Sequence, residues 1–148
     1  PAEMDKKAKR LKKVVALAEL EEQQECVEMK KVQQAHDQAV DRLGQLTSHR
    51  RKYQSEPMLG GSVGAARWQD YQRFLSRLNQ AVDSQSQFVN SSEQMLDAHR
   101  RRWQEKHKRV GLLEEIVQRY LKAEASRDER SMQKAMDEMQ PAAKSFGK

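Results

Sequence analysis

This chain has few of the residues that build a deep core or a covalent cross-link. Its only cysteine among 148 residues is Cys26, so no disulfide can form within the chain. Aromatic residues are only 5% of the sequence and hydrophobic residues 36%, whereas 34% are charged. No apolar run approaches the roughly 20 residues that span a bilayer. The composition therefore argues against a compact globule and a membrane span, and it favours long helices in a cytoplasmic protein.

Helix-breaking residues are also scarce, with three prolines and six glycines in the whole chain. They concentrate in the segment Ser55–Gly64, and Pro141 stands near the end. The residues on both sides are rich in good helix formers. The sequence predicts a single all-α domain over 1–148, with one helix at about 5–53, a loop at about 54–66, a second helix at about 66–140 and a flexible tail at 141–148.

Apolar residues in the second half recur every seven positions, which is the period of a coiled-coil seam. These residues are Trp68, Leu75, Val82, Val89, Leu96, Trp103, Val110 and Val117. The companion positions three residues later are Tyr71, Leu78, Gln85, Ser92, His99, Lys106, Leu113 and Tyr120. The first half has a weaker seam with the same period, at Ala8, Leu11, Val15, Ala18, Glu22, Glu25, Met29, Val32, His36, Ala39, Leu43, Leu46, Arg50 and Tyr53. Two such seams in one chain predict a long antiparallel two-helix coiled coil, a helical hairpin.

The two seams match in one register when the chain folds back at the glycine-rich loop. In that register Tyr53 meets Trp68 and Ala39 meets Val82. The same pairing places Lys6 and Lys7 beside Glu114 and Glu115, and Glu22 near His99. It also gathers two basic clusters into one band, made of Lys9, Arg10, Lys12, Lys13, Lys106, Lys108 and Arg109.

The sequence offers no pattern typical of an enzyme, a metal site or a cofactor site. Gly60–Gly64 lacks the Lys-Ser/Thr ending of a phosphate-binding loop and fits a hairpin turn better. The four histidines are never three or four residues apart, and Cys26 has no cysteine partner for a metal. We therefore expect no catalysis, no metal and no cofactor.

The net charge of +6 and the pI of about 9.5 leave three interpretations open. The basic residues could be solvated surface, could dock on acidic protein surfaces, or could bind nucleic acid. No nucleic-acid-binding motif accompanies them, and no aromatic residues are interleaved for base stacking. Protein partners are therefore the favoured interpretation, without nucleic acid.

Four aromatic residues lie near the predicted loop: Tyr53, Trp68, Tyr71 and Phe74. They could cap the coiled coil, which suits Trp68 as a seam residue. Phe74, together with Ala81, lies beside the seam and could instead anchor a partner.

Several segments resemble the FliJ family of the bacterial flagellar type III export apparatus. The most specific is Arg-Trp-x-x-Tyr-x-x-Phe-Leu at 67–75, after the glycine-rich turn; 10–19, 53–55, 76–82 and 103–109 are similar too. The resemblance implies a two-helix stalk that links a hexameric export ATPase ring to the export gate protein FlhA, promotes ring assembly and handles export chaperones. It also implies a monomer that is peripheral, through its partners, to the cytoplasmic face of the inner membrane.

Carried over by position, the resemblance implies a gate-binding face at Phe74, Leu78, Ala81, Gln85, Leu46, His49 and Tyr53. Two positions depart from the family pattern, because Gln85 stands in place of a histidine and His49 in place of a tyrosine. The basic band is then expected to enter the ATPase ring, as a rotor stalk would. The alternatives are the homologous stalk of a virulence secretion system, a general coiled-coil adaptor and a basic nucleic-acid-associated protein.

Overall fold

The computed structural model describes the backbone of residues 2–55 and 64–146, and the side chains of 3–55 and 64–140. It contains two α-helices, α1 at Ala2–Ser55 and α2 at Ala65–Phe146, and these two helices form a helical hairpin. The predicted fold class is confirmed. Most of the predicted loop falls on 56–63, outside the described residues. α2 continues past Pro141 to Phe146, where the sequence predicted a tail.

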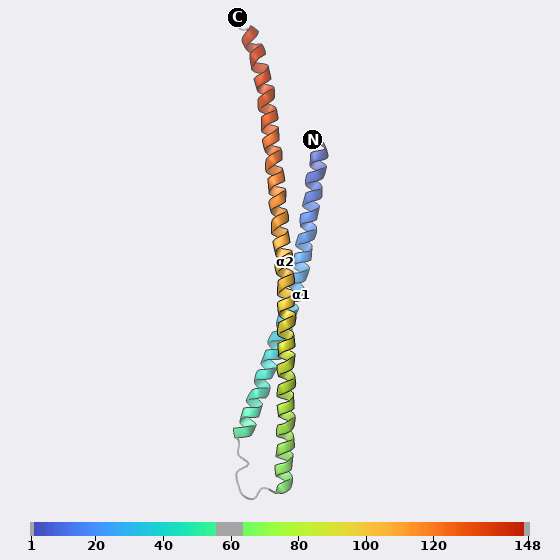
Figure 1. Ribbon diagram of the computed structural model, residues 1–148, viewed down its shortest axis with the longest axis vertical. Helices are drawn as coiled ribbons and strands as arrows, with labels where there is room; N and C mark the ends of the chain where they lie inside the picture. Colours follow the sequence, from blue (N-terminus) through green and yellow to red (C-terminus); the bar gives the residue numbers. More distant parts are fainter. Residues whose placement is uncertain (1, 56–63, 147–148) are drawn as a thin grey trace. The chain divides into compact units, whose positions relative to one another are not determined.

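The backbone contacts divide the chain into two compact units, which we describe separately. The terminal unit comprises Pro1–Gln23 and Glu105–Lys148, and the central unit comprises Gln24–Gln104. In each unit a stretch of α1 runs antiparallel to a stretch of α2 (Figure 1). The prediction of a single domain stays a prediction.

The seam between the helices is the predicted one, with one exception. All fourteen seam positions of α1 are buried or half-buried, as are the seam positions of α2 from Tyr71 to Tyr120. The buried apolar side chains are Ala18, Ala39, Val82, Val89, Leu96 and Val110. Trp68 is the exception, because 52% of it is exposed. The seam is thus narrow and made of small or branched side chains, as expected for two helices without a third layer.

Three polar side chains of the seam, Glu22, Glu25 and His99, contact polar groups of the other helix. In the central unit, Nδ1 of His99 lies 3.2 Å from a carboxylate oxygen of Glu25. In the terminal unit, Nδ1 of His107 lies 2.8 Å from Glu22. The expected approach of Glu22 to His99 is therefore wrong, and each histidine takes the nearest carboxylate of the other helix. Such pairing offsets the cost of holding polar groups between the helices.

The predicted register is wrong, by three residues at two contacts of the central unit and by six residues at a contact of the terminal unit. Tyr53 stacks on Tyr71 rather than Trp68, and the Gln85 amide nitrogen donates to the Ala39 carbonyl at 3.0 Å. Both contacts lie three residues later in α2 than predicted. In the terminal unit Lys7 lies over the Tyr120 ring at 5.1 Å, beyond the expected Glu114 and Glu115. A shift of three or four residues exchanges the two seam positions of each heptad, so the apolar pattern alone could not exclude it.

The ends of α2 differ in how they are held. At its start, the Gly64 carbonyl accepts hydrogen bonds from the amides of Arg67 and Trp68, at 3.1 and 3.2 Å, which closes the first turn. At the other end every side chain from 125 to 140 is exposed. Met132, Met136 and Met139 are 69%, 66% and 74% exposed, so this stretch presents the thin, unpaired apolar face that the sequence predicts. No helix among the described residues is both long and apolar enough to cross a membrane.

The register can be tested by a cysteine cross-link in a Cys26→Ser background. Cysteines replacing Ala39 and Gln85 should form a disulfide faster under mild oxidation than cysteines replacing Ala39 and Val82, because the Gln85 side chain reaches the Ala39 backbone. Non-reducing electrophoresis of the monomer band measures both rates. Faster closure of the 39/82 pair would restore the register expected from the sequence.

Candidate functional site

All seven residues predicted for gate binding lie in the central unit. The structure brings two of them into direct contact, because the rings of Tyr53 and Phe74 have centroids 4.5 Å apart. Leu46, Leu78 and Ala81 are half-buried along the seam. Phe74 is 50% exposed, so half of this ring is available on the surface. The expected face therefore contains one large exposed anchor beside partly buried apolar residues.

Phe74 belongs to an aromatic cluster formed by both helices. The rings of Tyr53 and Tyr71 stack at 4.8 Å, and Trp68 also stacks on Tyr71, at 5.7 Å. The Tyr71 hydroxyl also donates to the Tyr53 carbonyl at 3.3 Å. Tyr71 is thus the ring that joins the helices, whereas Trp68 is half-exposed and does not close the seam as predicted. The one-turn change in register explains this exchange.

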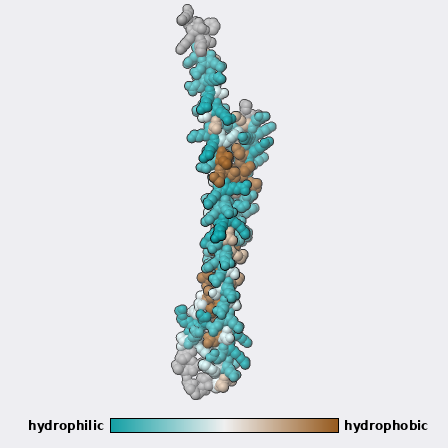
Figure 2. Space-filling view, viewed as in Figure 1, coloured by the Kyte–Doolittle hydropathy of each residue, from teal (hydrophilic) through white to brown (hydrophobic). Residues whose placement is uncertain are grey.

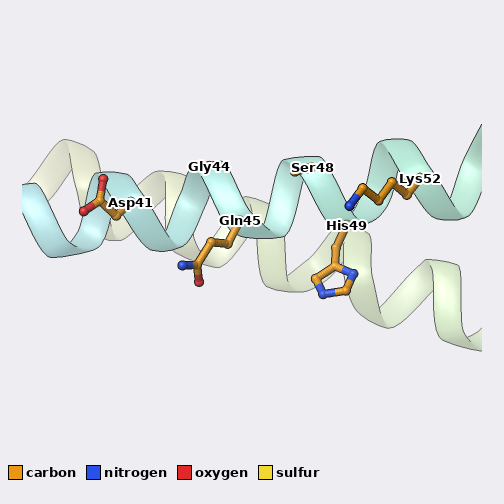
Figure 3. A pocket seen from close by; sticks show the side chains of 6 residues that line it. All are labelled: Asp41, Gly44, Gln45, Ser48, His49 and Lys52. Carbon is orange, nitrogen blue, oxygen red and sulfur yellow. The ribbon is translucent and has the colours of Figure 1, made fainter.

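The two positions that depart from the family pattern have different environments. Gln85 is half-buried and uses its amide within the hairpin, on the Ala39 carbonyl. His49 is exposed and lines a shallow groove along α1 with Asp41, Gly44, Gln45, Ser48 and Lys52 (Figure 3). Of these two residues, only His49 offers a polar group at the surface.

The groove beside His49 has no catalytic arrangement. All six lining residues come from α1, and Asp41 lies eight residues before His49, about 12 Å along the helix. A general base and its orienting carboxylate need to lie within hydrogen-bond reach, which this pair does not achieve. Across the part of the chain that the structure describes, no group of three or more His, Cys, Asp or Glu residues could hold a metal ion.

A basic hollow surrounds the aromatic cluster, and the sequence interpretation missed it. Its lining residues are Tyr53, Arg67, Asp70, Tyr71, Arg73, Phe74 and Arg77. Three guanidinium groups against one carboxylate give this end of the central unit a positive field, which favours an acidic partner. The signal was present in the sequence as Arg67, four residues before Tyr71, and Arg77, three residues after Phe74, on the same helix.

Two further apolar residues extend the face beyond the predicted set. Phe88 and Met95 follow Phe74 and Ala81 at the same seven-residue spacing, each one position before a seam residue. Both are 57% exposed. Residues at this spacing lie in one row along a coiled-coil helix. The candidate face is therefore a row of four residues beside the seam, longer than the resemblance implied.

The two clusters of the predicted basic band lie farther apart along the helices than the predicted register places them. Lys106 is bridged to Glu21 at 3.2 Å, and the neighbouring His107 contacts Glu22. Lys106 and His107 therefore lie alongside residues 21–22 of α1, about two turns away from Lys13. Both clusters belong to the terminal unit, and Lys9, Arg10, Lys12, Lys13, Lys108 and Arg109 are exposed. The register shift separates them.

Lys12 lies in a mixed environment rather than a basic one. It lines a groove in the terminal unit together with Val15, Ala16, Glu19, Glu114, Val117 and Gln118. The nearby carboxylates reduce its contribution to any positive surface. Farther along the same unit, burial and a 3.1 Å hydrogen bond to Glu124 raise the pKa of the Tyr120 hydroxyl, since both favour the neutral phenol.

The aromatic cluster makes a direct prediction about stability. Tyr71→Ala should lower the free energy of unfolding by about 2 kcal/mol, because it removes the stack on Tyr53 and leaves a gap between the helices. Trp68→Ala should cost clearly less, since half of Trp68 is already exposed. Urea unfolding followed by circular dichroism compares the two variants, and an equal loss in both would contradict the assignment of Tyr71 as the joining ring.

Comparison with known proteins agrees with the resemblance in the sequence. A family model described as Flagellar FliJ protein matches residues 7–145, which includes most of both helices.

Two curated relatives are named Flagellar FliJ protein. The one from Salmonella typhi is 27% identical over 103 residues, and the one from Escherichia coli (strain K12) is 29% identical over 103 residues. Each alignment covers 68% of this chain and 70% of the relative. No solved structure gives a significant match. Since the family model covers nearly the whole hairpin, the chain belongs to the FliJ family of flagellar proteins.

Proposed function

We propose that this chain is a non-enzymatic component of the flagellar type III protein export apparatus. In this proposal it links the export ATPase ring to the export gate protein FlhA, promotes ring assembly and handles export chaperones. It acts at the cytoplasmic face of the inner membrane through these partners. The observation that carries the proposal is the family match across both helices, residues 7–145. The relatives' flagellar names favour this assignment over a virulence secretion system.

The distribution of surface groups supports a linking role. The candidate gate face lies in the central unit, around Phe74, whereas the basic cluster at Lys9–Lys13 lies in the terminal unit. A protein that joins two partners needs two separate surfaces of different chemistry. Here one surface combines aromatic rings with arginines, whereas the other is cationic and has no aromatic ring, so each can select a different partner.

The structure sharpens the choice of residues for the ring contact. Lys106 is engaged with Glu21, and Lys12 shares a groove with Glu19 and Glu114. Reversing either charge would disturb contacts within the hairpin. Lys9, Arg10 and Lys13 are exposed and are better probes of binding to the ring.

The triple variant Lys9→Glu, Arg10→Glu, Lys13→Glu should lose most of its stimulation of ATP hydrolysis by the export ATPase, because a cationic contact becomes a repulsive one. The control is Lys30→Glu, Arg101→Glu, Arg102→Glu, which changes net charge equally in exposed residues of the central unit. A coupled ATPase assay measures the stimulation by each variant, after circular dichroism has shown that the two variants have equal helicity. Equal stimulation by the two variants would remove the Lys9–Lys13 cluster from the mechanism.

The gate contact requires a variant that separates binding from folding. Phe74→Ala should weaken binding to the export gate by about thirtyfold, or about 2 kcal/mol, as expected for a central aromatic anchor, and it should reduce motility. The Phe74 ring also packs on Tyr53, so this variant should cost some stability as well.

Ala81→Glu is the complementary variant, since it places a charge in the same row without removing the aromatic ring. Gln80→Glu is its matched control, because residue 80 is exposed and lies outside the row. Titration calorimetry with the cytoplasmic region of the gate measures each affinity. If Phe74→Ala and Ala81→Glu both bind the gate as tightly as the parent while folded, the carried-over face is wrong.

A further inference from the structure

An exposed apolar patch lies in the terminal unit, apart from the residues assigned above to gate binding. It consists of Val14 and Leu17 on α1 and Leu112 and Ile116 on α2, which are 44%, 59%, 60% and 50% exposed. Figure 2 shows apolar side chains gathered where the N-terminal part of α1 lies beside α2, within this unit. Four large apolar side chains exposed together differ from the single exposed residues that are ordinary on protein surfaces.

The contacts between the helices place the two pairs at the same level. Lys7 contacts Tyr120 and Glu21 contacts Lys106, so these two contacts bracket the patch from both ends. Midway between them, Val14 comes level with residues 112–113 of α2. Within each helix the members are three or four residues apart, which puts them on one face. The patch is therefore contiguous across both helices.

The patch faces away from the groove in the same unit. That groove is lined by Lys12, Ala16 and Glu19 of α1 and by Glu114 and Gln118 of α2, with Val15 and Val117 at its floor. On each helix, the patch residues lie on the other side of the seam from the groove residues, because they are offset by about half a turn. One side of the terminal unit is thus a polar groove and the other an open apolar surface.

Basic side chains border the patch. Arg10 lies two turns before Leu17, Arg109 two turns before Ile116, and Arg119 two turns after Leu112. All three arginines are exposed. Glu21 on this face is already bridged to Lys106. The exposed acidic residues near the patch are Glu3, Glu105 and Glu115, and they are outnumbered by the exposed basic residues Arg10, Lys13, Lys108, Arg109 and Arg119. The rim of the patch therefore carries a net positive charge.

We propose that this patch is a docking surface for an amphipathic helix of a partner protein that carries apolar residues on one face and carboxylates beside them. The apolar side chains of that helix cover Val14, Leu17, Leu112 and Ile116, and its carboxylates pair with the bordering arginines. Two antiparallel helices present a shallow apolar trough, and an amphipathic helix fills such a trough with the same seven-residue period. This contact is separate from the proposed gate contact, and it shares only Arg10 with the residues proposed for the ring contact.

The test uses the full chain and two synthetic helical peptides of about three heptads, with leucine on one face and either glutamate or lysine beside it. Fluorescence anisotropy should show that the glutamate peptide binds and the lysine peptide binds at least tenfold more weakly. Binding of the glutamate peptide should weaken as salt increases. Equal binding of both peptides, or no binding of the glutamate peptide, would overturn the proposal.

Variants of the chain localise the contact. Leu17→Ser and Ile116→Ser should each weaken binding of the glutamate peptide by about tenfold, as expected for apolar anchors. The matched control is Val40→Ser, since Val40 is 42% exposed but lies in the central unit. All three substitutions are at exposed positions, and circular dichroism confirms equal helicity before binding is measured. An equal loss in Val40→Ser, or a concentration-dependent dimer of the parent that Ile116→Ser abolishes, would assign the patch to nonspecific adhesion or self-association instead.

Discussion

The narrow seam between α1 and α2 is the constraint on which the rest of this molecule depends. Its buried apolar side chains are alanines, valines and one leucine, and none of the side chains that the structure describes is buried completely. A seam of this kind stabilises the pairing of two helices but leaves most of each helix in contact with solvent. The narrow seam keeps the core small and leaves long exposed surfaces on both sides of the seam. These surfaces are available for contacts with other proteins.

Polar and aromatic contacts determine which of several possible registers the seam adopts. A heptad pattern has two seam positions per repeat, so apolar packing alone permits shifts of about one turn. The stack of Tyr53 on Tyr71, the pairing of His99 with Glu25 and the bridge from Lys106 to Glu21 fix the pairing within each unit. Individually such contacts contribute modestly. In the alternative registers these polar groups would be unpaired, and this disfavours those registers.

The sequence predicted the fold class and nearly all of the seam because seven-residue spacing maps directly onto one helix face. It could not predict that Tyr71, rather than Trp68, meets Tyr53, because both are aromatic residues at seam positions. In the terminal unit a shift of about six residues moves the basic cluster at 106–109 away from the one at 9–13. In the sequence, Phe88 and Met95 can be placed one position before a seam residue. Only the structure shows that each side chain is more than half exposed. The assignment of partners came from family resemblance and not from the residues.

The central claim is that two surfaces in different units contact different partners. Hydrogen exchange measured by mass spectrometry on the full chain, alone and then with the export gate's cytoplasmic region or the export ATPase ring, tests it most directly. The account predicts that the gate slows exchange around 74–95 and leaves 9–13 unchanged, whereas the ring slows exchange at 9–13 and leaves 74–95 unchanged. Protection of the same segment by both partners, or protection of 9–13 by the gate, would contradict it.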